Sequence, residues 1–552
     1  MAQLAHELVE QAALWSPQAT ALRQGAERIS YAGLAAAGVA FAGALHAAGI
    51  GEGERVAICL SACTPAVAAL LGASHAGCAF VLVDPTLDKT GCAAILRDCG
   101  ARLLMTDALR YHALGDALRD CPALRCIVVL GSGTPRAGAV PALAWDGFLA
   151  SAAPAGQPGA TSATLAALVY TEPADGALSG QGQAQTPGPR GVALSHRNLV
   201  AGAASTARCL GLKPADRLLA ALPLHGDYGL NTLLAGFAAG ASVILDAAGP
   251  AVPGAPAATA APATLARLLA AGDVTVLAAP PCAWNELARQ DLDRAADCLR
   301  HAACAGGGLD RDALAALRGK LPHTRIHLLY DIGEACRSTS LMPAQLDERP
   351  GSIGRATPYS DWLVLRPDGR ECAPGEAGEL VRRGALVPLG YWNDPQASSE
   401  QFRLVPPAAG MATRGIGPDA GYWPGVTARR DLDGYVYLAE GRYDTILSGG
   451  YRISGREVEK IVVGTGLVAE AAAVGVAHPV LGQVIAVLAT PRPGARLDST
   501  ILFGACRARL PQHMLPAMVD VRRAPLPRAR DGQIDRALLA GELAPLFAEV
   551  SP

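Results

Sequence analysis

The sequence has little charge and few aromatic side chains. Charged residues make up 17% of its 552 residues and aromatic residues 5%, and the formal net charge is -2. No long run of Lys or Arg occurs, so the chain lacks the concentrated positive charge with which proteins bind nucleic acid or anionic membranes. We therefore expect no nucleic-acid partner and favour small or neutral partners.

Long apolar runs and metal-binding cysteine patterns are also missing. The Ala-rich residues 64–79 are interrupted by Gly, Ser and His, and residues 1–10 carry two acids and no basic stretch, unlike a secretory signal. The fourteen cysteines are scattered, and the closest pair, Cys59 and Cys63, has no second pair or His at zinc spacing. These absences predict a cytoplasmic protein with no membrane span and with reduced, mostly buried thiols.

Apolar residues are abundant, at 51%, so a chain of this length can bury a large core. Residues 55–60 read as a strand, a helix follows from Thr64, and residues 80–85 read as the next strand. The same alternation continues through residues 102–105 and 125–130. This pattern predicts βαβ units and an α/β fold built on parallel sheets.

The length of the predicted elements and the content of charged residues change near residue 441. Beyond it, short predicted strands and helices carry more charge than the preceding segments. We therefore divide the chain into an N-terminal domain, residues 1–440, and a small α+β domain, residues 441–552, which is large enough to fold as a unit.

Three motifs in the middle of the chain point to one family. They are Gly-Ser-Ile-Gly-Arg at 351–355, Pro-Gly-Glu-Ala-Gly-Glu at 374–379 and Gly-Tyr-Trp-Asn-Asp-Pro at 390–395. Their succession resembles the adenylate-forming (AMP-forming) superfamily of acyl-CoA synthetases, aryl-CoA ligases and peptide-synthetase adenylation domains, over nearly the whole chain. Residues 334–339 and 450–454 are most similar to the acyl-CoA ligases associated with the exosortase A system.

This resemblance implies an architecture and a set of ligands. A large N-terminal domain would bind ATP, Mg²⁺ and a carboxylate, and a small mobile C-terminal domain would rotate between adenylation and thioester formation. The thiol would be coenzyme A or the phosphopantetheine of an acyl carrier protein. Residues 441–445 would be the hinge, with Asp444 or Thr445 as the pivot, and a plain interdomain turn is the alternative.

The adenine side of the site matches the family. Gly306, Gly307 and Gly308 resemble the glycine turn beside the adenine ring, and Tyr330 begins a segment similar to the family's Tyr-Gly-x-Thr-Glu motif. In that motif Glu334 would help to hold magnesium, although a solvated or paired carboxylate is the alternative.

Several nucleotide contacts depart from the family pattern. Gly333 replaces a threonine that contacts the α-phosphate, and Val426 replaces the aspartate that binds both ribose hydroxyls. Arg442, another ribose contact in the family, is present, with an exposed salt-bridging arginine as the alternative. Gln533 replaces the lysine that contacts the carboxylate and the α-phosphate, and a neutral amide cannot stabilise charge as that cation does.

The phosphate loop is altered as well. Residues 170–192 contain an inserted Ala/Gly/Gln segment, and Arg190 is the cation that remains. Glu172 and Asp175 would repel a triphosphate, and Pro173 removes an amide donor. A surface loop is therefore favoured over a working phosphate cradle.

Residues 223–229 resemble the start of the family's acyl tunnel. His225 could orient a carboxylate there, because histidine changes charge near neutral pH. A hydrogen-bonded structural histidine is the alternative.

Together these departures predict a ligase-fold protein in which adenylation is impaired or lost and which binds an acyl or aryl carboxylate or thioester. One alternative is an active ATP-dependent carboxylate–thiol ligase that works through an acyl adenylate. Another is ATP-independent acyl transfer from a thioester, for which the sequence has no visible nucleophile–base–acid spacing.

Overall fold

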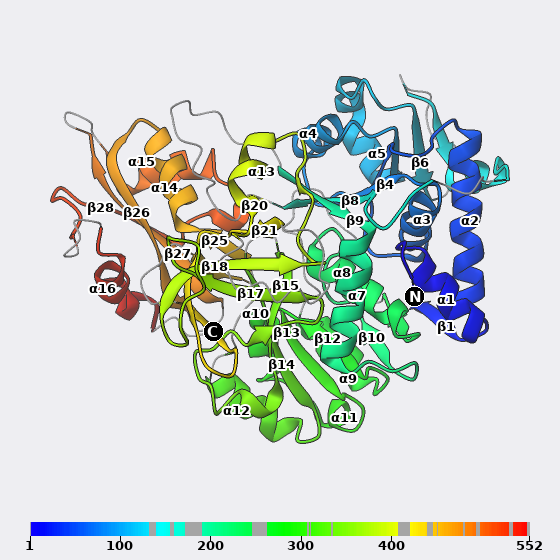
Figure 1. The fold of residues 1–552 in the computed structure, drawn as a ribbon. Helices are drawn as coiled ribbons and strands as arrows, with labels where there is room; N and C mark the ends of the chain where they lie inside the picture. The colour runs from blue at the N-terminus through cyan, green and yellow to red at the C-terminus, as the bar shows by residue number, and fades with distance from the viewer. Residues whose placement is uncertain are drawn as a thin grey trace.

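The computed structural model of this 552-residue chain has a mixed α/β fold that contains four sheets within the described residues. It describes residues 2–131, 140–154, 159–171, 190–245, 262–305, 309, 311–332, 335–406, 420–438, 445–449, 451–478, 481–492, 497–528 and 534–548. Figure 1 shows the last part of the chain, coloured orange to red, on one side of the molecule and the earlier sheets on the other.

The first sheet, sheet B, contains the predicted βαβ units. Its central strands are parallel, and β8 and β9 pair antiparallel at one end. In spatial order its strands are β19 (Gly390–Tyr391), β9 (Arg190–Ser195), β8 (Leu165–Thr171), β4 (Ala79–Leu82), β3 (Arg55–Cys59), β5 (Leu103–Asp107), β6 (Cys126–Leu130) and β7 (Ala142–Ala144). The helices of this region are α2 (Tyr31–Ala47), α3 (Thr64–His75), α4 (Lys89–Cys99), α5 (Ala108–Leu114), η1 (Gly115–Asp120), α6 (Trp145–Ala150) and α7 (His196–Leu210). The predicted strand–helix alternation is confirmed.

The second sheet, sheet A, also has a parallel centre, formed by β14, β13, β12, β10 and β11. In spatial order its strands are β16 (Arg355–Ala356), β15 (Ala335–Leu341), β14 (Arg325–Ile332), β13 (His301–Ala305), β12 (Val276–Ala279), β10 (Arg217–Leu219), β11 (Ser242–Ile244), β1 (Thr20–Gln24) and β2 (Glu27–Ser30). The helices of this region are α1 (Glu7–Trp15), α8 (Asp227–Ala238), α9 (Pro262–Ala270), α10 (Pro281–Leu287), α11 (Asp293–Ala296), α12 (Arg311–Lys320) and η2 (Pro343–Gln345).

A third sheet, sheet C, lies within residues 1–440 and is antiparallel, so the N-terminal part is not built from parallel sheets alone. Its strands are β17 (Ser360–Leu365), β18 (Ala377–Gly384), β20 (Phe402–Leu404), β21 (Ala420–Tyr422), β22 (Thr427–Arg430) and β23 (Val436–Leu438), and α13 (Pro395–Gln401) precedes β20. The βαβ pattern did not reveal this sheet, because hairpin connections carry no intervening helix.

The last sheet, sheet D, uses strands from the predicted C-terminal domain. They are β24 (Thr445–Ser448), β25 (Tyr451–Ser454), β26 (Val468–His478), β27 (Gly482–Pro491) and β28 (Met518–Val521). The helices are α14 (Gly455–Gly464), α15 (Ser499–Arg507), η3 (Gln512–Met514) and α16 (Arg536–Ala548). The predicted boundary at residues 440–441 lies outside the described residues.

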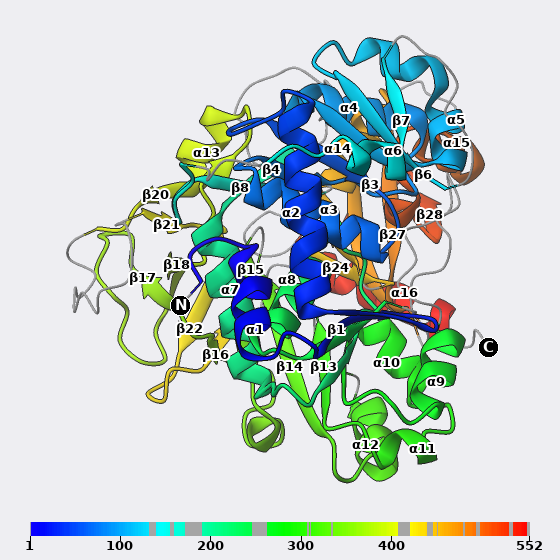
Figure 2. The ribbon, with the colours of Figure 1, turned by 90° about the vertical axis from the view of Figure 1, so that its right-hand side faces the viewer.

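Buried apolar side chains fill the spaces between helices and sheets, and α2 and α3 approach each other very closely. Figure 2 shows the two helices side by side. A Cβ atom on Gly72 of α3 would lie 2.6 Å from the carbonyl oxygen of Gly38 in α2 and 2.7 Å from Cβ of Phe41. Glycine is therefore required at Gly72 because the backbones nearly touch.

Two sequence predictions about the interior and the membrane can be checked in the described part of the chain. The cysteines there are free, and most of them are buried, as expected. No helix in the described ranges is both long enough and apolar enough to cross a bilayer.

The α2–α3 contact gives a stability prediction. Gly72→Ala should lower the free energy of unfolding by about 1–3 kcal/mol, because overpacking outweighs the helix propensity of alanine. Urea unfolding followed by Trp fluorescence would measure the change. Gly147→Ala in α6 is the control, since a Cβ there meets nothing within 4 Å and should leave stability unchanged or slightly higher. Equal effects of the two variants would contradict the packing argument.

Candidate functional site

The predicted site segments follow the carboxyl ends of neighbouring strands. In sheet A, β13 and β14 run parallel, with Ala305 opposite Leu329, so the chain leaves both strands at the same edge. Residues 306–308 follow β13, and residues 333–334 follow β14. Because open parallel sheets bind their ligands at this edge, the described ends of β13 and β14 lie where a ligand is expected.

Tyr330 and Val426 meet the same apolar cluster. Tyr330 lies in β14, and Val426 lies just before β22 of sheet C, where its carbonyl accepts a hydrogen bond of 2.8 Å from Leu380 N. Both side chains are half-buried and pack against one set of residues, namely Ile332, Ile353, Trp362, Val364, Leu380, Ala428 and Val436. Val426 thus packs against the same cluster as Tyr330, where it offers apolar contact and no side-chain acceptor.

Arg190, the predicted phosphate cation, is already engaged. It begins β9, its guanidinium lies 3.6 Å from a carboxylate oxygen of Asp394, and it stacks over the Tyr391 ring with the centroid 4.8 Å away. Asp394 also caps α13 by accepting a hydrogen bond of 2.9 Å from Ala397 N. The charge of Arg190 is therefore shared with a carboxylate that the fold fixes in place.

A capping box fixes the junction between β9 and α7. Ser195 and Asn198 exchange hydrogen bonds at the start of α7, directly after β9. The Asn198 amide also donates to the carbonyls of Ala385 and Val387, each at 2.8 Å. These bonds join β9 and α7 to the segment that leads into β19, and β19 carries the Tyr391 ring under Arg190.

His225 contacts an acid from the other sheet. It lies in the loop after β10 of sheet A, and its Nε2 is 3.7 Å from a carboxylate oxygen of Asp84, which follows β4 of sheet B. Both side chains are half-buried. The second Asp84 oxygen accepts two hydrogen bonds of 2.7 Å from Thr86, from its amide and its hydroxyl. These hydrogen bonds fix Asp84, so its carboxylate acts on the charge of His225 from a fixed position.

Burial disfavours the charged form of His225. Burial lowers the pKa of His225 below its ordinary value, and the Asp84 charge opposes that shift. A neutral imidazole has one N–H donor and one acceptor nitrogen, so it can orient a carboxylate without adding charge. Such a group suits binding of an acyl carboxylate or a thioester carbonyl.

The helix after His225 is tied to the strand that carries Tyr330. The hydroxyl of Tyr228 at the start of α8 donates to the Leu329 carbonyl at 3.1 Å. Beside this helix lies a cavity of about 20 Å³, with lining that includes Asp227, Asn231 and Asn198. It has room for about one water molecule. The predicted acyl-tunnel segment is therefore joined to β14, the strand that carries Tyr330.

Sequence reasoning did not single out Asp84. The signal was present, because Asp84 directly follows a predicted strand of a parallel sheet, where functional side chains gather. Its partner could not be identified, since nothing in the local sequence links residue 84 to residue 225.

Other predicted site residues lie outside the described part of the chain. They are Gly306, Gly307, Gly308, Gly333, Glu334, Arg442, Asp444 and Gln533, together with the phosphate-loop residues 172–189. Their contributions remain predictions from the sequence.

Comparison with known proteins identifies the family. A family model described as "AMP-binding enzyme" matches residues 9–392, and one described as "AMP-binding enzyme C-terminal domain" matches residues 457–533. The chain belongs to the AMP-binding enzyme family. This is the adenylate-forming acyl-CoA ligase superfamily that the motifs indicated.

Two curated relatives span most of this AMP-binding family member. It is 30% identical over 507 residues to a sulfoacetate–CoA ligase of Cupriavidus necator. The matched region covers 89% of this chain and 88% of the relative. It is 28% identical over 550 residues to a feruloyl-CoA synthase of an Amycolatopsis species, with 96% of each chain covered.

Solved structures support the same fold. The o-succinylbenzoate CoA synthetase of Bacillus subtilis superposes with a TM-score of 0.73 at 23% identity, covering 96% of this chain and 97% of that chain. The amide bond synthetase McbA of Marinactinospora thermotolerans gives a TM-score of 0.74 at 21% identity, covering 98% and 99%. At this level of identity the likeness establishes the fold alone.

The His225–Asp84 contact gives a prediction about charge. Asp84→Asn should lower the pKa of His225 further, because it removes the charge that opposes the effect of burial. NMR titration of histidine-labelled protein, with His225→Gln to assign the resonance, would measure the shift. Asp361→Asn is the matched control, since that carboxylate pairs with Arg383 in sheet C and should leave His225 unchanged. A rise in the His225 pKa in Asp84→Asn would contradict the assignment.

Proposed function

We propose that this member of the AMP-binding family binds an acyl or aryl carboxylate, or its thioester, and that its adenylation by ATP is impaired or lost. The observation that carries the proposal is the environment of Val426. In the position that corresponds to the family's ribose-binding aspartate, this side chain packs with Tyr330 against the apolar cluster of sheets A and C. Valine has no side-chain oxygen that could accept a hydrogen bond from a ribose hydroxyl.

The energetic argument rests on unpaired polar groups. A ribose hydroxyl placed against valine loses its hydrogen bonds to water without gaining a replacement, at a cost of about 1–3 kcal/mol per group. Arg190, the remaining phosphate cation, shares its charge with Asp394. Gln533 and Gly333, both known from the sequence, remove a cation and a hydroxyl at the α-phosphate. With the altered loop from Glu172 to Asp175, Val426, Gln533 and Gly333 make four departures that concern the same nucleotide, so compensation would have to act at several contacts together.

The acyl side of the site is better suited to binding. His225 is half-buried, its charged form is disfavoured by burial, and it follows a strand at the ligand-binding edge of sheet A. Its N–H would donate to a carboxylate or thioester oxygen, while Asp84 would hold the imidazole in position. Coenzyme A or a carrier-protein phosphopantetheine would supply the thiol part of a thioester.

A second function is favoured by the relatives. Both curated relatives named above are CoA ligases, and they match the chain along most of its length. In this alternative the protein is an active ATP-dependent carboxylate–thiol ligase. Arg190 and Glu334 would then contact the phosphates and Mg²⁺, as the family resemblance implies.

Nucleotide binding separates the two functions. We expect calorimetry with ATP and Mg²⁺ to detect weak or no binding, because the ribose and phosphate contacts are depleted. We also expect no pyrophosphate exchange over a panel of fatty and aromatic acids, since loss of a cation at the transition state alone costs about a hundredfold or more in rate. Micromolar ATP affinity together with exchange would overturn the proposal and favour the active ligase.

Restoring the lost contacts tests the cause. We expect Val426→Asp combined with Gln533→Lys to strengthen ATP binding at least tenfold, because the pair returns an acceptor to the ribose and a cation to the α-phosphate. Calorimetry would measure this change, and thermal unfolding would check the fold. Leu432→Asp, at a position 89% exposed in the turn after β22, is the control for the added carboxylate. Stable restored protein without tighter binding would contradict this explanation and point to the altered phosphate loop.

A further inference from the structure

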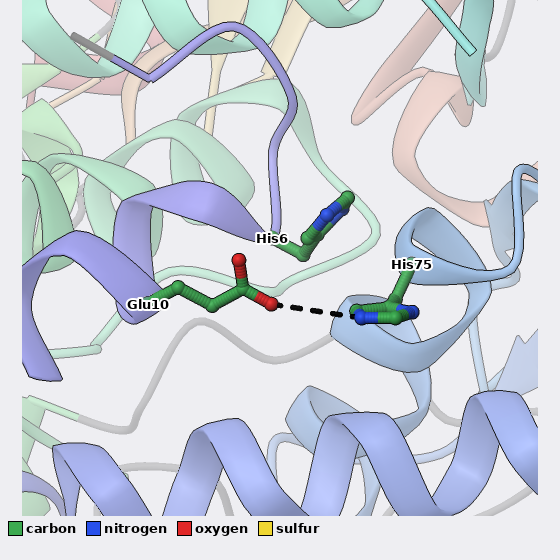
Figure 3. A group of neighbouring side chains, drawn as sticks. All are labelled: His6, Glu10 and His75. Atoms are coloured by element: carbon green, nitrogen blue, oxygen red, sulfur yellow. Dashed lines mark ion pairs between the residues drawn. The ribbon is translucent and has the colours of Figure 1, made fainter. Parts of the chain in front are cut away.

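A cluster of possible metal ligands lies on the N-terminal helices. His6 directly precedes α1, Glu10 lies one turn later in that helix, and His75 is the last residue of α3. One ligand atom from each residue can be chosen so that all three lie within 4.8 Å of one another. Figure 3 shows Glu10 and His75 facing each other, with His6 beside them.

The spacing is close to that of a zinc site. The Nε2 atom of His75 lies 3.7 Å from a carboxylate oxygen of Glu10. Tetrahedral Zn²⁺ holds His nitrogen and Glu oxygen at about 2.0–2.2 Å, which places two ligand atoms about 3.4 Å apart. Small side-chain rotations would therefore bring the three groups to bonding distance, whereas a direct His–Glu hydrogen bond would be shorter than the observed separation.

The surroundings orient the ligands. The Oγ atom of Ser74 lies 2.9 Å from Nδ1 of His6, which leaves Nε2 of that ring for a metal. Hydrogen bonds of this kind to the second ring nitrogen are typical of metal-bound histidine.

We propose that His6, Glu10 and His75 bind a divalent transition-metal ion, with Zn²⁺ the best match to a two-histidine, one-carboxylate set. Water would complete a tetrahedral shell. Because two ligands come from the start of α1 and the third from the end of α3, the ion would hold the two helices together. The site would thus be structural, and the proposal does not depend on the ligase function.

Direct metal binding tests this assignment. Full-length, tag-free, metal-stripped protein would be titrated with Zn²⁺ against a chromophoric chelator. We expect one site, weakened at least tenfold in Glu10→Gln and in His75→Gln, because each variant removes a ligand. His323→Gln changes an exposed histidine in another region and should bind as the unmodified protein does. Zinc should also raise the melting temperature of the unmodified protein but not of the two cluster variants.

Cobalt gives a second test that needs no variant. Co²⁺ in this nitrogen- and oxygen-ligated site should show d–d absorption without the strong near-ultraviolet thiolate charge-transfer band that bound cysteines would produce. The proposal is overturned by the absence of Zn²⁺ binding, by unchanged affinity in folded Glu10→Gln and His75→Gln proteins, or by a cobalt spectrum dominated by thiolate ligands.

Discussion

Two parallel sheets bring their loops together at one place, and the Asp84–His225 contact marks it. Asp84 follows β4 of sheet B and His225 follows β10 of sheet A, so each side chain owes its position to the carboxyl end of a buried strand. Strand pairing fixes where these ends lie, and the side chains that follow can therefore face each other across the two sheets. The candidate acyl site depends on this arrangement.

Sheet C adds a different constraint. Its apolar side chains meet Tyr330 and Val426, so burial stabilises the contact between sheets A and C around these two residues. The sequence predicts that Val426 replaces a ribose-binding aspartate. An aspartate packed against this cluster would need a partner for its charge, since unpaired charge next to an apolar cluster is costly, whereas valine needs none.

The N-terminal helices form a third, separate system. Gly38 and Gly72 let α2 and α3 approach closely, and the end of α3 then lies beside the start of α1. The backbone amide of Ala5 donates to Nδ1 of the buried His196 at 3.2 Å, which connects this region to α7 and so to β9. A closer contact between α1 and α3 would therefore also stabilise α7 and β9, the strand that contains Arg190.

The sequence by itself determined the family, the α/β class and the parallel strands such as β3, β4 and β5. The spacing of apolar residues and the local motifs depend only on residues that are neighbours in the chain. It also identified His225, Arg190, Tyr330 and Val426 as candidates. Only the tertiary structure decided their partners: Asp84 for His225, Asp394 for Arg190, and a shared apolar cluster for Tyr330 and Val426. The antiparallel sheet C and the His6–Glu10–His75 cluster were likewise revealed only by the tertiary structure. Each depends on how separate elements pack, and no local pattern encodes a contact that forms only when those elements come together.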